Sequence, residues 1–275
     1  AILLLTGCRS EIRMEDPKLV VEEAQKLVLS YKIKDARKLL LNHEDLFPED
    51  EALRPDFQYL LSLTLLHSIP PEKDLIERAE RVMVEMATAY PDHPQAASAW
   101  LYIGRMRDMR DYNDDAPRLD EAREAYRKLL ERYPESIEAG EAAARYAITF
   151  MKRTEDQPGD FEKGSTLLAE WLDNHPDSPQ ASSLYLFLAQ IYDVYLENPG
   201  KALEYFQRSD RLGFNNQGQA GSKYWRMAVL ARELGETRAA VEYCQRVIRD
   251  YSRSGRAYEA QQMLKQIREN HPELE

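Results

Sequence analysis

A repeat of 42 to 43 residues is the feature that most constrains how this chain of 275 residues can fold. It is marked by Pro48, Pro91, Pro134 and Pro176, whose spacings are 43, 43 and 42 residues. Twelve residues before each proline stands a small residue, and these are Ala36, Ala79, Ala122 and Gly164. Thirteen residues after the last three prolines stand Gly104, Ala147 and Ala189. An interval of this length indicates stacked copies of one supersecondary unit.

Each copy is predicted to form a helical hairpin. In the segment DEAREAYRKLLERYP, the positions of Ala122, Tyr126, Leu129 and Leu130 follow one face of a helix. The proline that follows cannot continue the helix, so we expect it to end one hairpin and to lie in the first turn of the next helix. Small residues are expected where paired helices cross closely. Because each hairpin must bury its other face against a neighbour, the sequence predicts an all-α fold of stacked hairpins.

These features resemble the tetratricopeptide repeat (TPR), a helix-turn-helix unit of about 34 residues. Residues 17–50 fit this unit without insertion, and so do the residues from Tyr224 to Ser252. Three units between them carry extra residues between their two helices, at 68–74, 111–118 and 153–160. The resemblance implies a right-handed α-solenoid over residues 17–272, made of about six TPR-like hairpins and a C-terminal capping helix in RAYEAQQMLKQIREN.

The resemblance also implies where a partner would bind. In TPR proteins the first helices of the hairpins line a concave groove that holds a peptide or a helix of another protein. The matching positions combine apolar and charged residues, and they are Leu101, Arg105, Asp108, Glu141, Ile148, Met151, Leu186, Gln190, Asp193, Trp225, Val229 and Arg232. The alternative is that several of them only pack against neighbouring helices.

Composition argues against several other functions. A net charge of −11 repels nucleic acid, although Lys223 to Arg256 is locally basic, a pattern typical of a solvated helix face. The five histidines are spread over different units, so neither a metal site nor an acid–base pair is predicted. The acidic stretch 111–115 lacks EF-hand spacing and is expected to be a loop. We expect no enzymatic activity, cofactor, metal or small-molecule substrate, because no catalytic or nucleotide-binding motif occurs.

Two further residue types are given structural roles. Cys244 is expected to be a small buried hydrophobic residue, since a reactive thiol needs an exposed, electropositive setting. Trp100, Trp171 and Trp225 all fall inside predicted helices, where filling of the core is the simplest role.

The first residues, AILLLTGC, form an apolar run that ends at a cysteine. Leu5-Thr6-Gly7-Cys8 resembles a bacterial lipobox, in which the cysteine thiol receives a diacylglycerol after small residues that admit the peptidase. This implies that residues 1–7 are the remnant of a lipoprotein signal peptide and that 8–16 comprise the lipidated Cys8 and a polar spacer. The alternative is an apolar first turn of helix. No aspartate follows Cys8, which by resemblance favours the outer membrane and its periplasmic face.

These observations together predict a TPR lipoprotein that acts as a protein–protein interaction scaffold in the cell envelope, in outer-membrane protein assembly. In layout it is similar to the TPR lipoprotein of the outer-membrane β-barrel assembly machinery and to the TPR domain of the Tol–Pal cell-division coordinator. Its expected partners are other envelope proteins, with the membrane reached through Cys8 and no nucleic acid bound. The alternative function is a peptide- or polymer-binding accessory subunit of an export or secretion machine.

Overall fold

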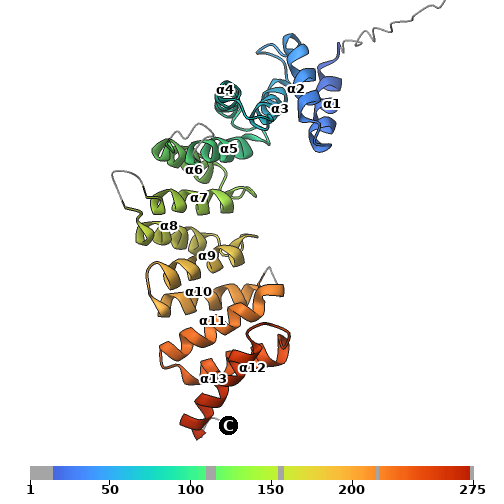
Figure 1. Cartoon of the computed structure of the whole chain (residues 1–275). Coiled ribbons are helices and arrows are strands. Elements are labelled where there is room, and N and C mark those ends of the chain that lie inside the picture. Colours follow the sequence, from blue (N-terminus) through green and yellow to red (C-terminus); the bar gives the residue numbers. More distant parts are fainter. Residues whose placement is uncertain (1–14, 110–115, 154–157, 215–216, 273–275) are drawn as a thin grey trace, which may run out of the picture. The chain divides into compact units, whose positions relative to one another are not determined.

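The computed structural model describes residues 15–109, 116–153, 158–214 and 217–272. Cys8, the signal-peptide remnant 1–7 and the acidic stretch 111–115 lie outside the described residues. The chain divides into two compact units, residues 1–136 and 137–275. Figure 1 labels the helices of both units. The first unit contains α1 (Pro17–Leu29), α2 (Ile33–Asn42), α3 (Arg54–Leu66), α4 (Lys73–Ala89), α5 (Ala96–Asp108) and α6 (Leu119–Arg132). The second contains α7 (Ala139–Met151), α8 (Phe161–Asn174), α9 (Ala181–Val194), α10 (Pro199–Leu212), α11 (Ala220–Glu233), α12 (Thr237–Asp250) and α13 (Ala257–Asn270).

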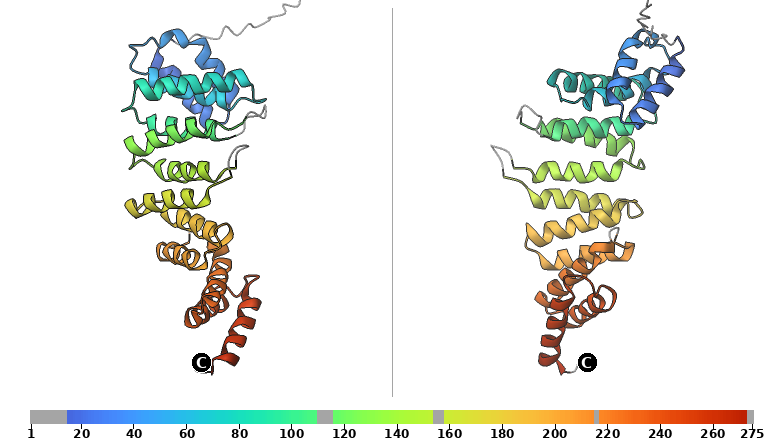
Figure 2. Two further views of the ribbon diagram at one scale, coloured as in Figure 1. Left: turned by 90° about the vertical axis from the view of Figure 1, so that its left-hand side faces the viewer. Right: turned by 45° about the vertical axis from the view of Figure 1, so that its right-hand side comes forward.

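The helices pack in consecutive pairs, which confirms the predicted all-α fold of TPR-like hairpins. In the first unit α1 packs on α2, α3 on α4 and α5 on α6, and each hairpin also packs on the next (Figure 2). In the second unit the pairs are α7 with α8, α9 with α10 and α11 with α12, while α13 covers α12 and α11 as a closing helix. The described residues contain no β-strand.

Small residues stand where the helices of a hairpin approach each other, as predicted. The side chains of Ala36, Ala79 and Ala122 are fully buried. A β-carbon on Gly164 would lie 2.6 Å from Cε of Met151 and 2.7 Å from the carbonyl oxygen of Ala147. Any larger residue at this position would push α8 away from α7.

The prediction that each proline begins the next helix is wrong. α4 ends at Ala89, Tyr90 caps it with φ −123° and ψ 62°, and Pro91 lies in the turn, five residues before α5 begins at Ala96. The same arrangement surrounds Pro134 and Pro176. A residue before proline is excluded from the helical region by the proline ring, so the tyrosine or histidine that precedes each proline ends the helix.

The turns between hairpins are joined to one another by side chains. The hydroxyl of Tyr133 donates a hydrogen bond of 2.6 Å to the carbonyl oxygen of Pro91 in the preceding turn, and Tyr90 donates one of 3.3 Å to the carbonyl oxygen of Glu49. In the second unit Nε2 of Gln180 donates to the carbonyl oxygen of Ile137 at 2.9 Å. Each of these bonds spans 41 to 43 residues, so it links one repeat to the next.

The extra residues inside two hairpins leave the connection between their helices closed. In the hairpin of α11 and α12, which has no insertion, the amide of Glu236 donates to the carbonyl oxygen of Ala231 at 2.8 Å. With an insertion, the amide of Arg118 donates to the carbonyl oxygen of Arg107 at 2.8 Å, and that of Asp160 to Phe150 at 2.9 Å. The chain on the two sides of each insertion is therefore joined by the same kind of backbone hydrogen bond as in the hairpin without one.

Candidate partner-binding sites

A groove in the first unit lies between α4, the end of α5 and the start of α6. Its volume is about 730 Å³. Its lining combines apolar side chains with charges of both signs, from Lys73, Ile76, Glu77, Glu80, Arg81, Val84, Glu85, Met106, Arg107, Met109, Ala116 and Arg118. Ligand sites in proteins commonly have volumes of about 300 to 1,000 Å³ and an apolar lining with a few fixed polar groups. The groove is thus large enough to hold several side chains of another molecule.

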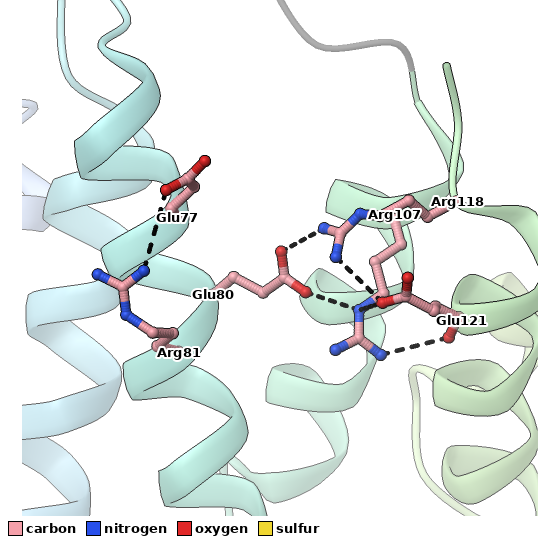
Figure 3. A network of polar contacts seen from close by, with 6 residues as sticks. All are labelled: Glu77, Glu80, Arg81, Arg107, Arg118 and Glu121. Atoms are coloured by element: carbon pink, nitrogen blue, oxygen red, sulfur yellow. Dashed lines mark hydrogen bonds and ion pairs between the residues drawn. The ribbon is translucent and has the colours of Figure 1, made fainter. Parts of the chain in front are cut away.

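One wall of the groove is an ionic cluster centred on Glu80. The carboxylate points from α4 towards two arginines, Arg107 on α5 and Arg118 immediately before α6 (Figure 3). Nε of Arg107 donates to Oε1 of Glu80 at 2.7 Å, and Arg118 binds the other carboxylate oxygen. Glu121 completes the cluster, 3.0 Å from Nη1 of Arg118 and 3.7 Å from Nε of Arg107. Three helices of two hairpins are therefore held in register by one carboxylate.

Glu80 is ionised at neutral pH despite its burial. Its side chain is only 13 % exposed, and burial by itself raises the pKa of a carboxyl group. The hydrogen bonds from Arg118 and Arg107, together with the charges of both guanidinium groups, outweigh burial and lower the pKa of Glu80 below its ordinary value. The hydrogen bond to Glu80 likewise raises the pKa of Arg118. This wall is consequently a fixed set of charges that a ligand does not have to organise.

The rim of the groove is less constrained. Arg81 and Glu77 lie one helical turn apart on α4 and are 4.0 Å from each other, with side chains 65 % and 52 % exposed. Exposed pairs of this kind contribute about 0.3 to 0.5 kcal/mol, so either member can exchange its partner at little cost. Met109 is 52 % exposed at the end of α5. The rim thus offers an apolar contact and a cation to a bound molecule.

The groove positions that the TPR resemblance implies in the first unit lie mostly inside the hairpin. Leu101 is buried, and so is Asp108, which accepts a hydrogen bond of 2.6 Å from the hydroxyl of Tyr126. Arg105 is half-buried, with its guanidinium 5.4 Å from the centre of the Tyr102 ring. Asp108 thus contributes to packing between α5 and α6, and Leu101 is not accessible at the surface.

In the second unit these positions are more accessible. Glu141 pairs with Arg145 at 2.6 Å along α7, Ile148 is half-buried and Met151 is buried. On α9, Leu186 and Asp193 are half-buried and Gln190 is exposed. On α11, Trp225 and Val229 are half-buried and Arg232 is exposed.

The structure brings some of these positions together through an arginine that the sequence analysis did not single out. Arg226, the residue after Trp225, donates from Nε to Oδ2 of Asp193 at 2.7 Å and also contacts Glu233 at 3.7 Å. This contact between the guanidinium group of Arg226 and the carboxylate of Asp193 joins α9 to α11, the first helices of two consecutive hairpins. Asp193 is therefore held next to the segment that carries Trp225.

Neither the Glu80 cluster nor Arg226 has a sequence motif that would reveal it. Glu80 is 27 residues from Arg107 and 38 residues from Arg118, so their contact depends on how two hairpins stack. The one signal in the sequence is that Arg118 ends an insertion between two helices.

Histidine and cysteine serve structural roles among the described residues. Nδ1 of His175 donates to the carbonyl oxygen of Trp171 at 2.8 Å, and His43 and His67 bind the carbonyl oxygens four residues before them in the same way. These histidines satisfy carbonyl groups at helix ends. Burial raises the pKa of the Cys244 thiol to about 11. No group of three potential metal ligands occurs within the described ranges.

The three tryptophans differ in how far they are buried. Trp100 is buried, whereas Trp171 and Trp225 are half-buried, and Trp171 stacks on His175 at 4.5 Å between ring centres. The prediction that all three fill the core is thus met only by Trp100.

Within the part of the chain that the structure describes, every helix is too short or too polar to cross a bilayer.

Comparison with known proteins agrees with this architecture. The sequence profile of the tetratricopeptide repeat matches residues 98–136 and 224–254. Both segments are thus similar to TPR units. They correspond to α5–α6 and to α11–α12, the two hairpins that carry Arg118 and Arg226. TPR hairpins are protein-interaction modules, and their stacks bind other polypeptides.

One solved structure supports a similar fold. PilF of Pseudomonas aeruginosa is 13 % identical, with a TM-score of 0.50 over 90 % of this chain and 96 % of that one. PilW, a widely conserved type IV pilus biogenesis factor, is 19 % identical with a TM-score of 0.47, covering 90 % of this chain and 97 % of that one. At these identities the likeness to PilF concerns the fold alone. No curated protein matches this chain significantly.

Proposed function

We propose that this TPR protein is a scaffold of the bacterial cell envelope that binds segments of other proteins and acts in outer-membrane protein assembly. In this proposal Cys8 carries lipid, so that the protein is anchored in the outer membrane and its repeats face the periplasm. Support for the anchor comes from Leu5-Thr6-Gly7-Cys8 and the polar spacer after it. The similarity in layout to the TPR lipoprotein of the β-barrel assembly machinery and to the TPR domain of the Tol–Pal coordinator supports the location.

The groove between α4, α5 and α6 is the observation that supports partner binding most directly. Ile76, Val84, Met106 and Met109 offer apolar surface, while Arg81 and Arg118 have side chains that are 65 % and 46 % exposed. A peptide segment with one large apolar side chain next to an acidic residue would match both features. The preformed Glu80 cluster would keep Arg118 in place, so binding would cost little ordering of the protein.

The partner can be identified by capture from detergent-solubilised envelope with the full-length protein. Recovery of outer-membrane barrel proteins would support the assembly role. Recovery of secretion or polymer-export components would instead favour the alternative, an accessory subunit of an export machine that binds a peptide or polymer. If neither class were enriched over a beads-only control, the scaffold proposal would be wrong.

Two groove variants and a matched control localise the binding. Met109→Lys places a charge on the apolar rim, and Arg81→Glu reverses the exposed cation. Both residues are more than half exposed, so both variants should fold normally. Val194→Lys puts the same charge on an apolar residue of the second unit that is 63 % exposed. We expect recovery of the partner to fall about tenfold for the two groove variants and to stay unchanged for the control. If the two groove variants and the control recovered the partner equally well, this groove would not be the binding site.

The anchor is tested separately with Cys8→Ala in the full-length gene. We expect the variant to leave the membrane fraction and to lose the mass of the acyl chains, since two or three chains give stable anchoring where one does not. A variant that stays in the membrane fraction with unchanged mass would show that Cys8 is not lipidated.

A further inference from the structure

The turn between α1 and α2 carries large side chains in an exposed and unfavourable place. Leu29, the last residue of α1, is 80 % exposed, and Tyr31 is 91 % exposed, the highest value among the large hydrophobic residues described. Tyr31 has a φ of 57°, in the left-handed region that residues other than glycine and asparagine seldom adopt. The fold gains no packing from either residue.

The equivalent turn of the sixth hairpin, between α11 and α12, has a glycine at the left-handed position. There Gly235, with a φ of 76°, donates to the carbonyl oxygen of Arg232 at 3.0 Å, and Glu236 donates to Ala231 at 2.8 Å. In the first hairpin the amide of Tyr31 donates to Val28 at 3.0 Å and that of Lys32 to Leu27 at 2.8 Å. Tyr31 therefore stands at the position that glycine occupies in the equivalent turn, where glycine has no steric cost.

The surroundings of Tyr31 are basic. Residues 26–38 contain five lysines and arginines and one acidic residue, in a chain whose net charge is −11. Lys32 and Lys34 are exposed beside Tyr31, and the Lys26 side chain is 69 % exposed, with its Nζ 3.5 Å from the carboxylate of Glu23 on the same helix. The tip of the first hairpin, residues 26–34, comprises the end of α1, the turn and the start of α2, and it carries an exposed leucine, an exposed tyrosine and three exposed lysines.

We propose that this tip contacts the surface of an anionic lipid bilayer, with Leu29 and Tyr31 inserted at the headgroup level and the lysines paired with lipid phosphates. Tyrosine is suited to this boundary because its ring is apolar and its hydroxyl is polar. Lysines near an anionic surface each strengthen binding, and their aliphatic stems can lie along apolar surface. An extended polypeptide partner is less well matched, because a single exposed turn offers it no groove.

The length of the chain before α1 is compatible with this contact, an argument that rests on the lipid anchor proposed above. Nine residues lead from Cys8 to Pro17, and such a segment spans at most about 30 Å. The 13 residues of α1 are about 20 Å long. The tip is therefore within reach of a bilayer that holds Cys8.

Vesicle binding of a chain without acyl groups tests the contact independently of the anchor. The full chain with Cys8→Ser is mixed with vesicles of phosphatidylcholine alone, or of phosphatidylcholine and phosphatidylglycerol, and sedimented. We expect binding to the anionic vesicles only, and weaker binding as salt is raised. Absence of binding to the anionic vesicles, or equal binding to both kinds, would overturn the proposal while leaving lipidation of Cys8 unaffected.

Tyr31→Gly is the decisive variant because glycine suits the left-handed position. We expect it to keep or raise the melting temperature while lowering affinity for anionic vesicles about tenfold, and Lys32→Glu to lower affinity at least about fivefold. Tyr258→Ala is the matched control, since Tyr258 is 69 % exposed on α13; its affinity should not change. Retention of full affinity by Tyr31→Gly, or an equal loss in Tyr258→Ala, would show that the tip makes no specific lipid contact.

Discussion

Gly104 on α5 lies directly against the ring of Tyr126 on α6. A β-carbon at position 104 would be 2.6 Å from Cζ and 2.7 Å from Cδ1 of that ring. Tyr126 is fully buried and its hydroxyl donates to Asp108 at 2.6 Å, so the ring has no free direction in which to move. The closest approach of these two helices is thus set by the absence of one side chain.

Gly104→Ala should therefore destabilise the hairpin of α5 and α6. We expect a loss of about 2 kcal/mol in the free energy of unfolding, as for other overpacked cores. Hydrogen exchange of amides in α5 and α6 measures it locally. Gly200→Ala in α10 is the control, because its nearest neighbour would be 3.6 Å away, and its stability should stay level or rise slightly. Equal protection in both variants would contradict the packing argument.

Glu80→Gln tests the ionic cluster and its dependence on pH. The pKa of Glu80 is lowered in the folded protein from its ordinary value of 4.5, so its contribution to stability is complete above that pH and is lost as the pH falls through the folded value. We expect the variant to be about 2 kcal/mol less stable at neutral pH. In urea unfolding the gap between variant and wild type should shrink on acidification. A gap that does not depend on pH would show that the carboxylate charge is not what stabilises the cluster.

Tyr133→Phe removes one link between successive turns. The variant loses the hydroxyl that donates to Pro91, at a cost of about 1 kcal/mol. Faster hydrogen exchange in the turn around residues 90–94 is the expected sign. Tyr90→Phe should have a smaller effect, since its bond to Glu49 is longer, at 3.3 Å. If hydrogen exchange increased more in Tyr90→Phe than in Tyr133→Phe, the hydroxyl hydrogen bonds would not be what stabilises the turns.

The thiol of Cys244 should be inert in the folded protein. Burial raises its pKa to about 11, and the charge of Arg232 only partly opposes this. In a Cys8→Ser chain at about pH 8, we expect alkylation to be at least about a hundredfold slower than for free cysteine and to become fast in urea. Rapid alkylation without denaturant would show that α12 opens locally.

The hairpins and their small residues could be predicted from the sequence because both depend on local periods and on steric fit within one repeat. The place of the prolines could not be predicted in the same way. At Pro91 the restriction on the preceding residue, Tyr90, ends one helix before the proline, and the next helix begins only at Ala96. Helix boundaries of this kind depend on the conformation of a turn, which the repeat spacing does not specify.

The binding surfaces were predictable only in part, because they depend on contacts between hairpins. Leu101 and Asp108 occupy the expected helix, yet both side chains are buried, and Asp108 accepts a hydrogen bond from Tyr126 on α6. Glu80 and Arg118 had no local signature, since their pairing arises when two hairpins stack. Asp193 was singled out by its place in the repeat, but its partner Arg226 became evident only from the structure.

The hydrogen bond from Tyr133 to Pro91 has a consequence for how such a chain can evolve. Donor and acceptor lie 42 residues apart, which is one repeat. A duplicated repeat would therefore carry a tyrosine that donates to the turn before it. It would also carry a proline-containing turn that accepts the same bond from the repeat after it. A gene segment duplicated in tandem would encode a hairpin already fitted to its neighbours. An array with this turn can therefore gain whole hairpins while the contact between successive turns stays the same.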